Sequence, residues 1–148
     1  MKTKTLLVSL FMVLFLVTCQ KEAYTPLPHV DVNIQIFPNS IQYLSLNSIG
    51  GYEYLTANPP SRGIIVYRID QSSFVAFERT CPYDPEGCCE GTQCSRLVVD
   101  DESPFLISDP CCGSLYLILD GSNVSGPSQY PLKQYHTSFD GISLRIYD

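Results

Sequence analysis

The chain has 148 residues, a length that suits a single domain with a modest core. Nine lysines and arginines face fifteen aspartates and glutamates, and this acidic balance argues against nucleic acid or anionic lipid as a partner. Seven cysteines in so short a chain favour an exported protein in an oxidising compartment.

The first residues are typical of a secretory signal. Two lysines precede a mainly apolar run over residues 6–17, which is shorter than the about 20 residues of a membrane-spanning helix. Leu16-Val17-Thr18-Cys19 resembles the lipobox of bacterial lipoproteins, in which the cysteine is acylated and becomes the new N-terminus. We therefore predict a signal peptide over residues 1–18 and a lipid on Cys19. The alternative is an ordinary signal with a cysteine near its end by chance.

Residues 19–30 contain two prolines and no periodicity, and are expected to form a tether. Cleavage of the signal removes two of the nine basic residues, and the remaining seven against fifteen acidic residues give a formal charge of −8. Membrane attachment would then depend on acyl chains such as palmitate. We expect a lipid-anchored protein of the cell envelope, at the periplasmic or surface face of the outer membrane. Its partners would be the membrane and an envelope protein or ligand of unknown identity, but no nucleic acid.

Short strands are expected throughout residues 31–148. Apolar residues at positions 30, 32, 34 and 36 alternate with polar ones, which predicts a half-buried strand over Val30–Ile36. No segment after the signal has an apolar stripe of helical period. About nine or ten short strands between turn residues indicate an all-β domain, an antiparallel sandwich or small barrel. The further strands are predicted at Ile41–Leu46, Tyr52–Thr56, Gly63–Ile69, Phe74–Thr80, Leu97–Val99, Phe105–Ser108, Leu115–Leu119, Leu132–His136 and Ile142–Tyr147.

Two cysteine-rich segments, Thr80–Ser95 and Asp109–Ser114, interrupt the strand pattern. An even number of cysteines in a small exported domain predicts a disulfide framework, and buried thiols or a metal site are the alternatives. The candidates are Cys81, Cys88, Cys89, Cys94, Cys111 and Cys112.

The order of features between Phe74 and Tyr135 resembles the Rieske iron–sulfur domain. That family carries Cys-x-His in a first loop, where this chain has Cys81-Pro82-Tyr83. It carries Cys-Pro-x-His-Gly-Ser in a second loop, where this chain has Asp109-Pro110-Cys111-Cys112-Gly113-Ser114. Its third loop, Gly-Pro-Ala/Ser-x-x-Pro-Leu, matches Gly126–Leu132. The resemblance implies a Rieske-like sandwich with cysteine-rich loops.

The ligand positions of that family have changed in this chain. A Rieske [2Fe–2S] centre needs two thiolates on one iron and two imidazoles on the other. Position by position, Cys81 keeps the first thiolate and Asp109 replaces the second. Tyr83 and Cys112 stand where the imidazoles should be. The resemblance therefore implies a Rieske-like domain that has lost its cluster.

The resemblance also implies a pattern of bridges. In many Rieske proteins a disulfide ties the two ligand loops, and Cys111 occupies the partner position in the second loop. We expect Cys111 to pair with Cys88 or Cys89, and Cys94 to pair with the other one. Cys81 and Cys112 could close the vacated cluster site with a third bridge.

Other chemistry has weaker support in the sequence. Cys89-x4-Cys94 has the first spacing of a plant-type ferredoxin but lacks the next thiolate, and no zinc knuckle is present. His29 falls in the tether and His136 in a strand, and neither has ligand spacing. The acidic run Asp100–Glu102 is typical of a solvated turn more than of a calcium site.

We therefore expect an envelope lipoprotein with a structural or binding role, with no catalytic residue, no metal and no cofactor. The sequence contains no nucleophile elbow, zinc-protease motif or phosphate loop. Two redox alternatives stay open, an electron-transfer Rieske-type [2Fe–2S] protein and a thiol–disulfide redox protein.

Overall fold

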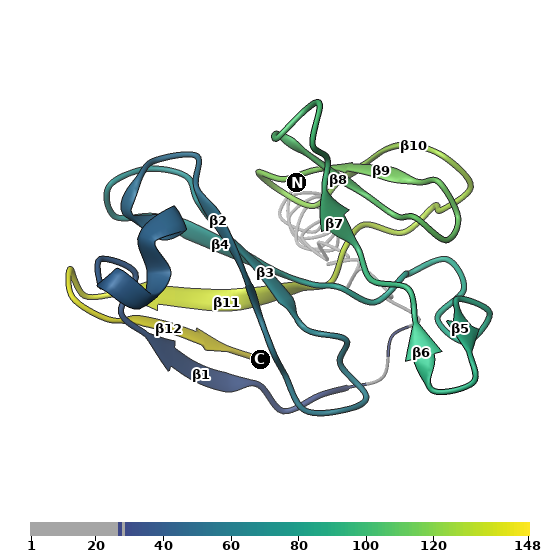
Figure 1. Cartoon of the computed structure of the whole chain (residues 1–148), viewed down its shortest axis with the longest axis horizontal. Coiled ribbons are helices and arrows are strands. Elements are labelled where there is room, and N and C mark those ends of the chain that lie inside the picture. The colour runs from purple at the N-terminus through teal and green to yellow at the C-terminus, as the bar shows by residue number, and fades with distance from the viewer. Residues whose placement is uncertain (1–26, 28) are drawn as a thin grey trace, which may run out of the picture.

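The structure is a computed structural model that describes residue 27 and residues 29–148 (Figure 1). The predicted signal peptide, Cys19 and most of the tether lie outside the described residues. Within the described part of the chain, no helix is long and apolar enough to cross a membrane.

The larger of the sheets has six strands in the order β1-β12-β11-β4-β3-β2. Each neighbouring pair is antiparallel. In Figure 1 this sheet occupies the left side of the domain and combines the N-terminal strands with the C-terminal hairpin β11–β12. Its strands are β1 (Asn33–Ile36), β2 (Tyr52–Leu55), β3 (Ile64–Arg68), β4 (Phe74–Glu78), β11 (Gln134–Phe139) and β12 (Leu144–Tyr147).

A four-stranded antiparallel sheet in the order β10-β9-β8-β7 forms the second layer, and a two-stranded hairpin lies beside it (Figure 1). These strands confirm the predicted all-β, antiparallel class. The bounds are β5 (Cys89–Glu90), β6 (Gln93–Cys94), β7 (Val98–Val99), β8 (Leu106–Ser108), β9 (Leu115–Leu117) and β10 (Asn123–Ser125).

Strands β3 and β4 are buried on both faces and join two hydrophobic cores. Ile64 and Val66 pack into the core of the large sheet. Ile65 and Phe77 point the other way, into a core shared with the four-stranded sheet. Successive side chains of a strand alternate between faces, so one hairpin serves both cores. The first cysteine-rich segment, which follows β4, therefore leaves from the buried centre of the fold.

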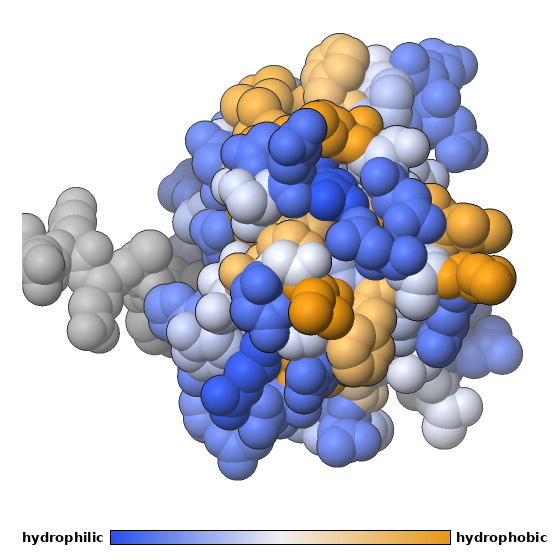
Figure 2. Space-filling view, turned by 90° about the vertical axis from the view of Figure 1, so that its left-hand side faces the viewer, coloured by the Kyte–Doolittle hydropathy of each residue, from blue (hydrophilic) through white to orange (hydrophobic). Residues whose placement is uncertain are grey.

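One predicted strand is wrong. Residues Ile41–Asn47 form a 3₁₀ helix, η2, in place of the strand expected at Ile41–Leu46. Within η2 Leu46 is buried and Tyr43 packs partly buried against the same core, while Ile41 and Leu44 are exposed. Figure 2 looks onto this end and shows hydrophobic groups separated by hydrophilic ones.

Other element bounds differ from the prediction. The first strand begins at Asn33, although Val30 and Val32 ahead of it are buried. The strand predicted at Leu132–His136 is β11, which begins at Gln134 and continues to Phe139. The short strands β5, β6 and β10 were not predicted, because each has two or three residues and little apolar character.

Candidate functional site

The first cysteine-rich segment begins directly after β4, at a buried carboxylate. Glu78 is 3 % exposed and accepts hydrogen bonds from Ser61 Oγ at 2.6 Å, Thr80 Oγ1 at 2.6 Å and Tyr135 Oη at 2.6 Å. The amides of Arg62 and Thr80 donate to it as well. Five donors compensate the burial of this charge. These hydrogen bonds fix the position of Glu78, three residues before Cys81.

The second cysteine-rich segment is a tight loop between β8 and β9. Asp109 Oδ1 accepts the amide hydrogens of Cys111 at 2.9 Å and Cys112 at 3.4 Å. The Gly113 amide donates to the Asp109 carbonyl at 2.8 Å, and Gly113 has a φ of +76°. An aspartate that binds amides two and three residues ahead stabilises such a turn. The loop therefore presents Cys112 toward the first segment.

The third loop, Gly126–Leu132, packs on the second. The Ser128 amide donates a hydrogen bond to Ser114 Oγ at 3.1 Å. Gly126 has a φ of +98°, and a Cβ there would lie 2.5 Å from Ser114 Cα. Glycine is thus required both by the backbone conformation and by the close approach of the two loops.

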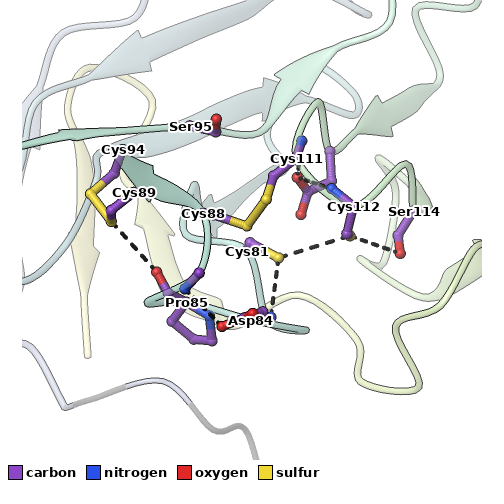
Figure 3. The surroundings of a disulfide bond; sticks show 12 residues. Cys81, Asp84, Pro85, Cys88, Cys89, Cys94, Ser95, Cys111, Cys112 and Ser114 are labelled. Carbon is purple, nitrogen blue, oxygen red and sulfur yellow. Dashed lines mark hydrogen bonds between the residues drawn. A yellow bond between two sulfur atoms is a disulfide. The ribbon is translucent and has the colours of Figure 1, made fainter. Parts of the chain in front are cut away.

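Two disulfides confirm the predicted disulfide framework in part. Cys88 is bonded to Cys111 and joins the first two loops, and Cys89 is bonded to Cys94 and closes the β5–β6 hairpin (Figure 3). The first bridge has a Cα–Cα distance of 5.7 Å. Both pairs lie within the alternatives that the sequence left open.

The third bridge is absent from the structure. Cys81 and Cys112 are free thiols, and their Sγ atoms face each other at 3.9 Å (Figure 3). A disulfide requires about 2.05 Å. Cys81 Sγ accepts the Asp84 amide hydrogen at 3.4 Å, and Cys112 Sγ lies 3.2 Å from Ser114 Oγ. Each sulfur thus also contacts a polar group of its own loop.

Asp109 completes a buried group with Cys81. A carboxylate oxygen of Asp109 and the Sγ atoms of Cys81 and Cys88 lie within 4.8 Å of one another. Asp109 is 2 % exposed, and its Oδ2 makes no hydrogen bond within the described residues. Burial, and next the neighbouring Asp109 carboxylate, raise the pKa of Cys81 to about 12. Cys81 is therefore protonated at neutral pH.

Tyr116 lies close enough to Cys112 and Asp109 to interact with them electrostatically, and it was not singled out from the sequence. It is fully buried in the second core, and its hydroxyl has no hydrogen-bond partner within the described residues. Burial raises the pKa of Tyr116 to about 12. The alternation of β9 was the available signal, because it turns Leu115 and Leu117 away and Tyr116 inward.

The other candidate residues lie apart from the thiol pair. Tyr83 is 51 % exposed, so its side chain is not enclosed by the loops. His29 contacts Asp31 and Asp148, and the ring of His136 packs against Tyr147. Asp100 Oδ1 accepts the amide hydrogens of Glu102 and Ser103, which is a turn contact.

The donor set does not fit a Rieske cluster. Such a cluster needs two imidazoles, and both histidines of the chain make their contacts away from the loops. The loops bring the Cys112 thiol to 3.9 Å from the Cys81 thiol, and they bring a carboxylate oxygen of Asp109 to within 4.8 Å of Cys81 and the disulfide-bonded Cys88. The chemistry open to the two free thiols is the formation of a disulfide.

Comparison with known proteins gives no assignment, because neither a family model nor a curated protein matches this chain.

Proposed function

We propose that the chain is a lipid-anchored protein of the cell envelope whose Rieske-like domain works without an iron–sulfur cluster, in a structural or binding role. The observation that carries this proposal is the donor set at the meeting point of the loops. If the Rieske resemblance holds, Asp109 and Cys112 stand at two of its ligand positions and Tyr83, which is 51 % exposed, stands at a third. Neither iron could be ligated in the Rieske manner.

Covalent bonding between the loops supports the structural part of the proposal. A cluster would cross-link the first and second loops through metal, whereas here the Cys88–Cys111 bridge does so. The hydrogen bond from the Ser128 amide to Ser114 Oγ adds the third loop. A disulfide and a hydrogen bond thus connect the three loops to one another.

The binding part of the proposal is supported by an open hollow beside the bridge. The side chains of Glu90, Gln93 and Ser95 give it polar groups that suit a polar ligand or peptide segment. The lining residues are Gly87, Cys88, Glu90, Gln93, Cys94, Ser95 and Cys111.

A thiol–disulfide redox role is the second candidate, since two free thiols face each other at 3.9 Å. The attacking group in disulfide exchange is the thiolate. The raised pKa of Cys81, about 12, disfavours its thiolate at neutral pH. An electron-transfer role has less support, because it needs the cluster whose imidazole ligands are missing.

A gain-of-ligand variant tests both the Rieske likeness and the loss of the cluster. The triple variant Tyr83→His, Asp109→Cys, Cys112→His restores two thiolates and two imidazoles. Expressed in parallel and purified without oxygen, the triple variant should be brown and contain iron with acid-labile sulfide. The unmodified protein should be colourless, and the single variant Tyr83→His should resemble it.

Two results would contradict the proposal. A brown unmodified protein would show that the cluster persists with other ligands. A triple variant that keeps its Cys88–Cys111 bridge by mass mapping but takes up no iron would show that the loops are not of the Rieske type.

A further inference from the structure

Two thiols stay free in a region where the neighbouring cysteines are bonded. Of the six cysteines in residues 29–148, four form two disulfides, and Cys81 and Cys112 keep their thiols. The two Sγ atoms lie 3.9 Å apart, and the Cys81 thiol donates its hydrogen toward Cys112 Sγ. Since a disulfide has an S–S distance of about 2.05 Å, a movement of about 2 Å would join the two sulfurs. The pair is therefore close to a bridge that the structure does not contain.

The loop that carries Cys112 has room for such a movement. Cys112 is half-buried, and no atom beyond the chain neighbours lies within 4 Å of the Cβ position of Gly113, the next residue. Cys81 is 1 % exposed, and its Sγ accepts the Asp84 amide hydrogen at 3.4 Å. A change between staggered side-chain conformations displaces a sulfur over such distances. We therefore expect Cys112 to be the sulfur that moves when a bridge forms.

The two thiols also differ in access to solvent and in their chemistry. Burial raises the pKa of Cys81 to about 12, so this thiol keeps its proton at neutral pH. Cys112 Sγ is partly open to solvent and lies 3.2 Å from Ser114 Oγ. Because Ser114 Oγ accepts a hydrogen bond from the Ser128 amide, its own hydroxyl hydrogen remains available as a donor. The Cys81 thiol and the Ser114 hydroxyl can therefore both stabilise a Cys112 thiolate, the attacking species in disulfide exchange.

We propose that Cys81 and Cys112 are a redox-active pair, which a disulfide compound converts reversibly into a third bridge between the first and second loops. Cys112 reacts first, because it is the accessible thiol, and Cys81 is the resolving cysteine that closes the bridge. This inference goes beyond the proposed structural role. It gives the second candidate function a defined order of thiols and a class of oxidant, and it does not depend on the loss of a cluster.

The exchange proceeds in two balanced steps. The Cys112 thiolate attacks one sulfur of the oxidant disulfide, so that a mixed disulfide forms and the first oxidant thiolate leaves with the proton that Cys112 gave up. Cys81 Sγ then attacks Cys112 Sγ, the bond to the oxidant breaks, and the Cys81 proton goes to the second departing thiolate. Two protein thiols are oxidised to a disulfide, and the oxidant disulfide is reduced to two thiols. The second step is intramolecular, and proximity offsets the weak acidity of Cys81.

A redox titration tests whether the pair switches. The full-length mature protein is extracted anaerobically and equilibrated in buffers with graded ratios of reduced to oxidised glutathione. After acid quenching and alkylation, mass mapping locates the free thiols and the bridges. We expect Cys81 and Cys112 to be alkylated together at reducing ratios and to be bonded to each other at oxidising ratios. The Cys88–Cys111 bridge should remain intact over the ratios at which the pair switches, because the structure contains that bridge beside the free pair.

A matched pair of variants tests the order of the two thiols. When oxidised glutathione is added, Cys81→Ser should accumulate one glutathione per chain on Cys112, because no resolving thiol is left. Cys112→Ser should acquire glutathione on the enclosed Cys81 more slowly, by a factor of about ten or more. In the unmodified protein, the adduct on Cys112 should appear transiently before the bridge forms.

Three results would overturn the proposal. The first is a pair that stays in one state at every glutathione ratio. The second is a bridge from Cys81 to Cys88, whose Sγ atoms also lie within 4.8 Å of each other. The third is an equal rate of glutathione addition in the two variants. If a variant does not keep its Cys88–Cys111 bridge, the transient adduct of the unmodified protein decides the order instead. None of these results alters the iron content, by which the proposed function is tested separately.

Discussion

The hydroxyl of Tyr135 on β11 donates a 2.6 Å hydrogen bond to the buried carboxylate of Glu78, at the end of β4. The two residues are 57 positions apart in the chain. This contact joins the last hairpin of the large sheet to the start of the first cysteine-rich loop. The loop is therefore anchored in the body of the fold before its first cysteine.

Removal of that hydroxyl should destabilise the domain. Tyr135→Phe keeps the ring and deletes the donor, so the free energy of unfolding should fall by about 1.5–3 kcal/mol, the range for a hydrogen bond to a charged group. Urea unfolding measures the change. Tyr147→Phe, made on the neighbouring strand β12, is the matched control and should alter stability by less than a third as much.

Alkaline pH should destabilise the protein. Burial raises the pKa of Cys81 from 9.0 to about 12 and that of Tyr116 from 10.0 to about 12. Because the protonated forms are favoured in the folded state, their contribution is complete below pH about 9 and declines as the pH rises toward 12. Urea midpoints between pH 7 and pH 11 should fall, and Tyr116→Phe should reduce the slope. A urea midpoint that is constant between pH 7 and pH 11 would contradict the raised pKa values of Cys81 and Tyr116.

The two disulfides should differ in their contribution. The Cys88–Cys111 bridge spans 23 positions and the Cys89–Cys94 bridge spans 5. In the chain-entropy model the first stabilises by about 3 kcal/mol and the second by about 2 kcal/mol. Thermal melts of the paired serine variants compare them. We expect the variant without the Cys88–Cys111 bridge to melt at the lower temperature. Equal melting temperatures for the two variants would contradict the larger stabilisation that we assign to the longer bridge.

The lipid anchor is tested at Cys19, which lies outside the described residues. Cys19→Ala should prevent acylation and leave a soluble or unprocessed chain in cell fractionation, because no basic patch is expected to hold the protein at the membrane. Thr18→Ala, next to it, preserves the cysteine and should still fractionate with membranes. Normal processing and membrane retention of Cys19→Ala would show that the lipobox-like segment is not used.

Strand positions were predictable where short runs rich in β-branched and aromatic residues lie between turn residues, as in Tyr52–Leu55 and Ile64–Arg68. The segment Ile41–Asn47 has a similar mixture of residues, but tertiary packing buries only Leu46 and a 3₁₀ helix results. The local sequence pattern does not decide between a strand and a helix in this segment, because the surface against which the segment packs determines which of its side chains are buried.

The candidate site was predictable as a set of cysteines but not in its geometry. The sequence limited the partner of Cys111 to two residues, and the structure selects Cys88. It could not show whether Cys81 and Cys112 form a bridge, since a separation of 3.9 Å depends on the placement of two separate loops. Glu78 was missed because two of its hydroxyl donors, Ser61 and Tyr135, lie 17 and 57 positions away.

The most direct test of the proposed loss of the cluster is the iron and acid-labile sulfide content of the full-length protein, extracted anaerobically from membranes. Without two imidazoles beside Cys81, Asp109 and Cys112, we expect a colourless protein with neither iron nor sulfide in stoichiometric amount. Two irons and two sulfides per chain, with visible absorption, would contradict the account and establish the electron-transfer alternative.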